Sequence, residues 1–244
     1  LVSGTGNPIR NGFGLAFVGL DAGYDSKYFG VTTSLRFGPG VPQFYAQDPV
    51  LGGIGAITQG FVTWKPPESF TIDGGMFGTI YGAEVAESWI NLNYTRGALY
   101  YYLQPFWHTG LRATYQLTEE LSVKALLVND VNRLSTSTTL QAGLQLGYSS
   151  GDFGAALGTL QTLGESTDLG FDRFVDAVIT YSPGDFTLIF NGDFNMNDTT
   201  DASAYGGSLA LGYQFAPAFG VAARGEYLDF NADGDDDHLV TGTL

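Results

Sequence analysis

Apolar and polar residues alternate with a period of two along most of this chain. Between Thr139 and Tyr148 the apolar positions are Leu140, Ala142, Leu144, Leu146 and Tyr148, and the residues between them are Gln and Gly. The segment 205–215 repeats the pattern with Leu209, Leu211, Tyr213 and Phe215. A period of two places successive side chains on opposite faces of a β-strand. The sequence therefore predicts an all-β protein whose strands each have one apolar face.

The apolar faces are expected to meet lipid. Mean hydropathy is +0.04, and charged residues make up 14% of the chain, against about 25% in an ordinary soluble domain. A membrane-spanning helix needs about 20 consecutive apolar residues, and the chain has no such run. The faces opposite the apolar ones consist of Gly, Ser, Thr, Gln and Asn, where a soluble sandwich would have charged residues. A soluble β-sandwich or adhesin is the alternative that this pattern disfavours.

The connections between the predicted strands fall into two lengths. Short ones are expected near 66–68, 118–120, 149–152, 182–185 and 216–218, and long ones at about 38–56, 78–107, 130–138, 161–171, 196–204 and 229–237. Aromatic pairs such as Tyr148 and Phe153 flank the short turns, as rings do at a membrane interface. Short turns on one rim and long loops on the other are typical of a transmembrane antiparallel up-and-down β-barrel, with short periplasmic turns and long extracellular loops.

We count six hairpins, at about 11–37, 57–77, 108–129, 139–157, 172–195 and 205–227, followed by a thirteenth strand that begins at His238. Bacterial single-chain barrels have an even number of strands. We therefore expect residues 1–244 to be a single transmembrane barrel domain of about 12–16 strands that is truncated at its C-terminus. The same argument allows a truncation at its N-terminus.

Composition excludes several functions. Ten basic residues against 25 acidic ones give a net charge of −15, which cannot neutralise a run of phosphates, so no nucleic-acid partner is expected. The chain has no Cys, which removes disulfides, thiolate metal sites and Cys nucleophiles. His108 is predicted to face inward beside Trp107 with no adjacent Ser, so the Ser–His pair of a hydrolase is missing. We expect no enzyme activity and no catalytic residues.

Three short stretches resemble one known family. Residues 77–84 read Phe-Gly-Thr-Ile-Tyr-Gly-Ala-Glu, residues 91–96 read Asn-Leu-Asn-Tyr-Thr-Arg, and residues 105–110 read Pro-Phe-Trp-His-Thr-Gly. Together they resemble the β-barrel porins of the OmpL-like family, in which G-x-E, N-x-N-Y-[ST]-R and P-F-x-H-T-G stretches occur in this order. The resemblance implies an outer-membrane porin of a Gram-negative envelope, in contact with the bilayer and lipopolysaccharide. It brings no catalytic residues to carry over.

Strand parity predicts which charges face the lumen. The inward set is Arg36, Asp73, Arg112, Lys124, Asp176, Asp193, Arg224 and Glu226. It is balanced in sign, so the excess negative charge of the chain lies in loops and rims. Charged rings of this kind tune the passage of ions and polar solutes. The alternative is that these residues pair locally and fill a blocked lumen.

The connection at 78–107 is the longest in the chain, and a long loop in a compact protein is usually functional. It carries Glu84, Glu87 and Arg96 among many aromatic residues. One hypothesis is that it folds inward and narrows the pore. The other is that its second half is a strand with an aromatic girdle.

A calcium site is a further candidate. The segment 229–237 has the alternating oxygen ligands of a D-x-N-x-D-G loop, with Asp229, Asn231, Asp233, Asp235 and Asp237 as the candidate ligands. Oxygen ligands with a turn-making Gly suit Ca²⁺. Position twelve of the motif is Val240, which lacks the bidentate carboxylate of an EF-hand. A solvated acidic loop is the alternative, and no other cofactor is expected.

The sequence thus favours an outer-membrane porin through which small hydrophilic solutes or ions diffuse passively in a water-filled lumen. The acidic outer mouth should attract cations. The alternative function is a non-conducting barrel that acts as a structural subunit of a larger outer-membrane assembly. A homo-oligomer or a larger envelope complex fits either function.

Overall fold

A computed structural model describes residues 15–45, 55–67, 69–132, 139–164, 172–198, 200–231 and 237–243. Strand residues dominate this part of the chain. The strands are β1 (Val18–Asp25), β2 (Phe29–Phe37), β3 (Ile57–Trp64), β4 (Phe70–Gly78), β5 (Trp107–Gln116), β6 (Leu121–Asn129), β7 (Leu140–Ser150), β8 (Phe153–Leu163), β9 (Arg173–Tyr181), β10 (Phe186–Asn197), β11 (Ala202–Ala216), β12 (Phe219–Asn231) and β13 (Asp237–Thr243). Two short helices, α1 (Val41–Phe44) and α2 (Ala98–Tyr102), interrupt them. Neither helix is long and apolar enough to cross a membrane.

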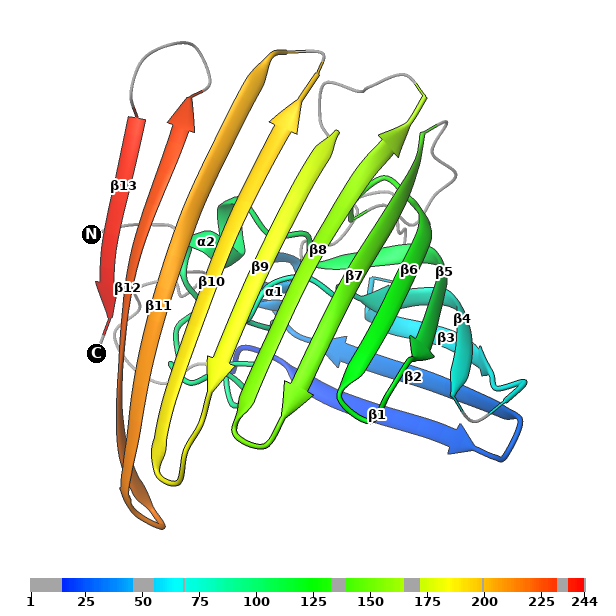
Figure 1. Cartoon of the computed structure of the whole chain (residues 1–244), viewed down its shortest axis with the longest axis horizontal. Coiled ribbons are helices and arrows are strands. Elements are labelled where there is room, and N and C mark those ends of the chain that lie inside the picture. Colours follow the sequence, from blue (N-terminus) through cyan, green and yellow to red (C-terminus); the bar gives the residue numbers. More distant parts are fainter. Residues whose placement is uncertain are drawn as a thin grey trace.

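All the described strands belong to one sheet in which each pairs with its neighbours in sequence, in the order β1 to β13. Every pairing is antiparallel, as in the register Leu144↔Thr159 between β7 and β8. Figure 1 shows the sheet curling, so that β1 to β4 lie at a steep angle to β7 to β13. The predicted all-β, up-and-down topology is confirmed, and so is the thirteenth strand. Within the described residues, β1 pairs only with β2, and β13 only with β12.

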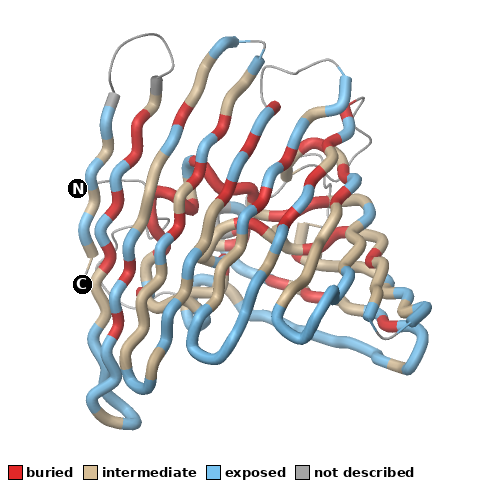
Figure 2. The backbone as a smooth tube through the Cα atoms, in the orientation of Figure 1, coloured by how far each residue is buried: buried red, intermediate tan, exposed pale blue. Residues whose placement is uncertain are grey.

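The two faces of the sheet differ as the alternation predicts. On β7, Leu140, Leu144, Leu146 and Tyr148 are exposed, and Gln141 and Gln145 between them are buried. Figure 2 shows this alternation of exposed and buried positions along the strands from β7 to β12. An outer face of exposed Leu, Val, Phe and Tyr is stable in hydrocarbon, because these side chains there avoid water. The apolar residues therefore point outward rather than into a dry interior between two sheets.

The short turns lie where they were predicted, but two of the long connections are shorter than expected. β10 and β11 stay in register up to Asn197↔Ala202, which leaves only residues 198–201 between them. β12 and β13 stay paired up to Phe230↔Asp237. The prediction of loops at 196–204 and 229–237 was wrong at their ends. Polar residues there continue the backbone ladder, because hydrogen bonds between strands do not depend on side-chain hydropathy.

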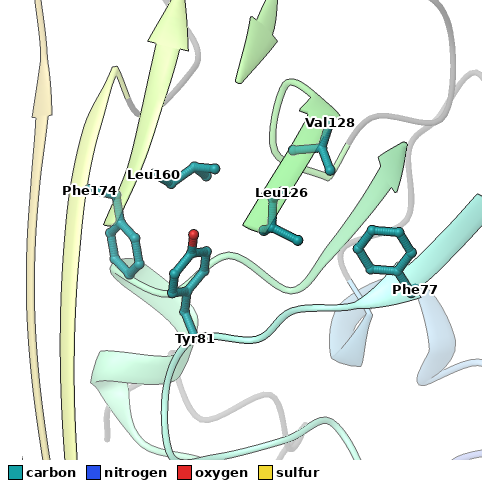
Figure 3. Close-up of a cluster of buried hydrophobic side chains, with 6 residues drawn as sticks. All are labelled: Phe77, Tyr81, Leu126, Val128, Leu160 and Phe174. Carbon is teal, nitrogen blue, oxygen red and sulfur yellow. The ribbon is translucent and has the colours of Figure 1, made fainter. Parts of the chain in front are cut away.

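The connection between β4 and β5, residues 79–106, lies on the concave side of the sheet, and we call it the plug. It contains α2 and contacts strands that lie far apart in the sheet, from β2 to β12. The prediction that small polar residues alone line the lumen was wrong, because part of the inner face is apolar. Tyr81 of the plug packs with Phe77, Leu126, Val128, Leu160 and Phe174, all buried side chains from β4, β6, β8 and β9. Figure 3 shows these six side chains converging.

Candidate functional site

Tyr81 anchors the plug against the wall formed by β7 and β8. Its hydroxyl donates a hydrogen bond to the carbonyl oxygen of Thr159 at 2.7 Å. Its ring lies over two wall glycines: a Cβ at Gly158 would come within 2.6 Å of the ring, and one at Gly143 within 2.3 Å of the hydroxyl. The ring also makes an edge contact with Phe174. Because Gly143 on β7 and Gly158 on β8 have no side chains, they leave the space that Tyr81 fills.

Substituting Gly158 with Ala should destabilise the protein by about 1–3 kcal/mol, the usual cost of overpacking a filled site. The added methyl group must displace the Tyr81 ring or move β8, and both elements are packed on several sides. Thermal unfolding in detergent, followed by circular dichroism, measures the effect. Gly225→Ala on β12 is the matched control, because a Cβ there meets nothing within 4 Å. Equal unfolding temperatures for the two variants would show that Tyr81 is not held as described.

Arg224 on β12, near the C-terminal end of the sheet, also binds the plug from the inner face. Its Nη1 donates to Oε1 of Glu84 and to the carbonyl oxygen of Thr95, both at 2.6 Å. Its Nε lies 3.3 Å from Oε2 of Glu226, its neighbour on the same face of β12. Burial raises the pKa of Glu84, and the charge of Arg224 opposes that rise. We call Glu84, Arg224 and Glu226 the Arg224 cluster.

The same two carboxylates hold the start of α2. Glu226 accepts hydrogen bonds from the backbone N–H groups of Ala98 at 2.9 Å and Leu99 at 3.1 Å. Glu84 accepts one from Gly97 at 2.6 Å. The first N–H groups of a helix have no hydrogen-bond partner within the helix. Carboxylates at this end accept hydrogen bonds from them and are attracted to the positive end of the helix dipole. The N-cap residue, Gly97, has no side chain to cap the helix, so Glu84 from the plug and Glu226 from the wall do so.

Arg36 on β2 makes a second tie to the plug. Its Nη2 donates to Oε1 of Glu87 at 3.0 Å, its Nη1 to Oδ1 of Asp21 at 2.8 Å, and its Nε to the hydroxyl of Tyr45 at 3.1 Å. The Tyr45 hydroxyl in turn donates to Glu87 at 2.5 Å, and burial raises the pKa of Tyr45. The indole of Trp107 donates to the carbonyl oxygen of Tyr45 at 2.8 Å. Arg36 thus joins β1, the α1 segment and the plug.

Asp176 on β9 and Asp193 on β10 lie directly opposite each other in the sheet. The side-chain amide of Asn191 donates to Oδ1 of each, at 2.9 and 3.0 Å, and accepts from the N–H of Ala83 in the plug at 2.8 Å. The Oδ2 atoms of both aspartates are buried without a hydrogen-bond partner. No ion pair among the described residues includes either carboxylate. The pair places two carboxyl groups side by side on the inner wall, held by Asn191.

The remaining inward charges bind other residues of the strands, and among the described residues they make no direct hydrogen bond or ion pair with the plug. Asp73 and Arg112 form an ion pair of 2.8 Å across β4 and β5, and the guanidinium lies 4.6 Å from the ring centre of Phe77. Lys124 on β6 donates to Oε1 of Gln145 at 3.3 Å. Gln145 also donates to the carbonyl oxygen of Ile80, so this group reaches the plug indirectly.

All eight charges assigned to the inner face by parity lie there, buried or half-buried: Arg36, Asp73, Arg112, Lys124, Asp176, Asp193, Arg224 and Glu226. Whether they line a conducting pore stays a prediction. Asn191, Tyr45 and Tyr81 were missed. Parity could have found Asn191, which shares a face with Asp193. Tyr81 lies within the 77–84 stretch that resembles the family, but no sequence signal marks Tyr45, whose partner Glu87 lies 42 positions away.

The three candidates in the 78–107 loop have different positions. Glu84 and Glu87 bind wall arginines. Arg96 is buried within the plug, where its guanidinium donates to the carbonyl oxygen of Ala86, so it organises the plug itself. The alternative that the second half of the loop is a strand was wrong: residues 98–102 form α2, and β5 begins only at Trp107, the last residue of the predicted loop. Glu226 of the wall and Glu84 of the plug cap a helix here, which favours the helix over an extended chain.

Most of the predicted calcium loop lies outside the described residues, including Asp233 and Asp235 and the side chains of Asn231 and Asp237. Asp229 lies on β12, where its Oδ2 accepts hydrogen bonds from the hydroxyls of Tyr205 at 2.8 Å and Tyr227 at 3.1 Å. The part of the chain that the structure describes contains no group of three or more acidic or His side chains placed to hold a metal ion. Calcium binding at 229–237 stays a prediction.

An antiparallel sheet with a lipid-compatible outer face, and an inner face whose charges hold an inward-folded loop, defines a β-barrel protein of the outer membrane. The family model described as "Putative beta-barrel porin-2, OmpL-like" matches residues 5–243. The chain belongs to this family of outer-membrane porins, in agreement with the three short stretches. The first two stretches contain Glu84 and Arg96 of the plug, and the third contains the first residues of β5.

Solved structures of outer-membrane proteins are also similar to this chain. The loop L8 deletion mutant of OmpT, an outer membrane protein of Vibrio cholerae, has a TM-score of 0.43 and 16% identity, over 92% of this chain and 88% of that one. OccK10 (OpdN) of Pseudomonas aeruginosa has a TM-score of 0.36 and 11% identity, over 93% and 91%. A search of curated proteins returned no match.

Proposed function

We propose that this porin lets small hydrophilic solutes or ions diffuse passively across the outer membrane, past the plug. The observation that supports the proposal is that the plug leaves cavities beside it. It binds the wall at separate polar sites on β2, β10 and β12, and cavities remain on two of its sides. Polar groups and cavities along an inner wall suit hydrated solutes, and a lipid environment outside suits the apolar face.

We also propose a preference for cations. The chain carries a net charge of −15, and the basic and acidic residues assigned to the inner face balance, so the excess acidic residues lie in loops and rims. A field of this sign raises the local concentration of cations at the entrance.

Planar-bilayer recordings of the chain refolded in detergent test both parts. We expect discrete channel openings, and a reversal potential that favours K⁺ over Cl⁻ under a salt gradient. Bilayers exposed to detergent alone are the control. Preference for Cl⁻ would contradict the cation part.

The second candidate function is a non-conducting structural subunit, which the several polar ties of the plug to the wall favour. A folded chain that inserts but stays silent at all voltages would support it and contradict diffusion.

A further inference from the structure

A cavity lies between the plug and the inner wall of β10, β11 and β12. Two adjacent rows of the sheet form its floor: Asn191, Ser208 and Glu226 are in register across the three strands, and Ile189, Ala210 and Arg224 form the next row. All of these except Glu226 line the cavity, and plug residues including Glu84, Asn93 and Leu99 cover it. Its volume is about 60 Å³, below the range of about 300–1,000 Å³ for sites that bury a drug-sized ligand, so it suits a molecule with few non-hydrogen atoms.

The charged groups that line this cavity are already bonded to one another. Glu84 uses one carboxylate oxygen for Arg224 and the other for the N–H of Gly97. Arg224 binds Glu84 and Thr95 through Nη1 and Thr243 through Nη2 at 3.4 Å. The two lining charges are of opposite sign and cancel. A charged ligand entering the cavity would find no unpaired counter-charge and would still lose its hydration.

The polar groups that remain are neutral. Asn93 is 5% exposed, and its Oδ1 is buried without a hydrogen-bond partner. Buried polar atoms in proteins are almost always bonded, so an unbonded acceptor inside a cavity indicates a missing donor. Ser208 offers a hydroxyl from the opposite side, on β11, and the described residues make no hydrogen bond to it. The two groups together can accept from and donate to hydroxyl groups of one molecule.

The rest of the lining is largely apolar. Leu92, Leu99 and Ile189 contribute aliphatic side chains, and Tyr100 contributes an aromatic ring. Pockets with mostly apolar walls and a few convergent polar groups suit small organic molecules, because the apolar part gains from burial and the polar groups set orientation. A bare ion would gain nothing from these walls.

We infer that this cavity is a binding site for a small uncharged solute rich in hydroxyl groups, such as a polyol, held between Asn93 on the plug and Ser208 on β11. As a statement about which solute diffuses, this rests on the proposed function. As a binding site it can be measured without any diffusion.

The test is isothermal titration calorimetry of the whole chain in detergent with three three-carbon probes: glycerol, the anion glycerate and the cation of 3-amino-1,2-propanediol. We expect saturable binding of glycerol and at least tenfold weaker binding of the two charged probes. Asn93→Leu and Ser208→Ala should each weaken glycerol binding by about three- to tenfold, the effect of one lost hydrogen bond. Ser122→Ala on β6, outside the cavity, is the matched control and should leave binding unchanged. Thermal unfolding of each variant shows that it is folded.

Two results would overturn the site. One is the absence of saturable glycerol binding, as expected if the cavity holds only water. The other is equal binding by wild type, Asn93→Leu and Ser208→Ala. Bilayer conductance of the same samples separates this inference from the proposed function. If the chain binds glycerol and does not conduct, the site stands and passive diffusion is contradicted. If it conducts without binding glycerol, only the site is contradicted.

Discussion

Removing the plug should raise the single-channel conductance several-fold. Gly78 at the end of β4 pairs with Trp107 at the start of β5, so an Asn-Gly turn can join these strands directly in place of residues 79–106. The plug holds a helix and a buried cluster of aromatic and aliphatic side chains on the concave side of the sheet. Without it, water and ions would fill that volume, and the resistance of the lumen would fall. Planar-bilayer recording of the deletion variant measures the change.

The deletion needs a control for the engineered turn. The same Asn-Gly pair placed in the short turn 182–185, between β9 and β10, changes only the opposite rim and should leave conductance unaltered. An unchanged conductance in the folded deletion variant would show that the plug lies outside the conducting path. The hypothesis that the loop narrows the pore would then be wrong.

Arg224→Met should destabilise the protein by about 3–5 kcal/mol, the cost of leaving buried charges without their partner. Arg224 is 4% exposed and lies between Glu84 and Glu226. Met keeps much of the side-chain volume, so the loss comes from two carboxylates that face each other without a cation. Those carboxylates also cap α2, so we expect the plug to loosen first. Thermal unfolding in detergent and protease cleavage within the plug measure the two effects.

This variant should also depend on pH. Burial raises the pKa of Glu84, and Arg224 lowers it, so removing Arg224 raises that pKa further. A carboxyl whose pKa is higher in the folded than in the unfolded state binds a proton preferentially when folded, so stability falls as the pH rises through this interval. Arg224→Met should therefore regain part of its lost stability in mildly acidic buffer.

The matched control is Arg173→Met. Arg173 and Asp198 form an ion pair of 3.1 Å, but both side chains are exposed, and exposed pairs contribute about 0–1 kcal/mol. We expect little loss of stability and no new cleavage in the plug. If both variants unfold at the same temperature, the Arg224 cluster does not hold the plug.

Much of the wall could be predicted from the sequence because each strand is read locally. Leu144 and Gln145 are neighbours in the chain, and a period of two alone places them on opposite faces. The same parity places Arg36, Asp176 and Arg224 on the inner face, although Arg36 and Arg224 are 188 positions apart. The ends of β10 and β12 were misjudged, because polar residues such as Asn197 can continue a ladder that hydropathy does not mark.

What the sequence by itself determined is the outer surface: which side chains face lipid, where the short turns lie, and the sign of the charges within. The course of the plug was decided only by the tertiary structure. Residues 98–102 of the plug form a helix because Glu226, which lies 128 positions after Ala98, caps it. Tyr81 is anchored where Gly143 and Gly158 leave room for its ring and hydroxyl. Such contacts depend on distant segments meeting in space. A local pattern cannot encode them, because the same residues would be exposed or unpaired without their partners.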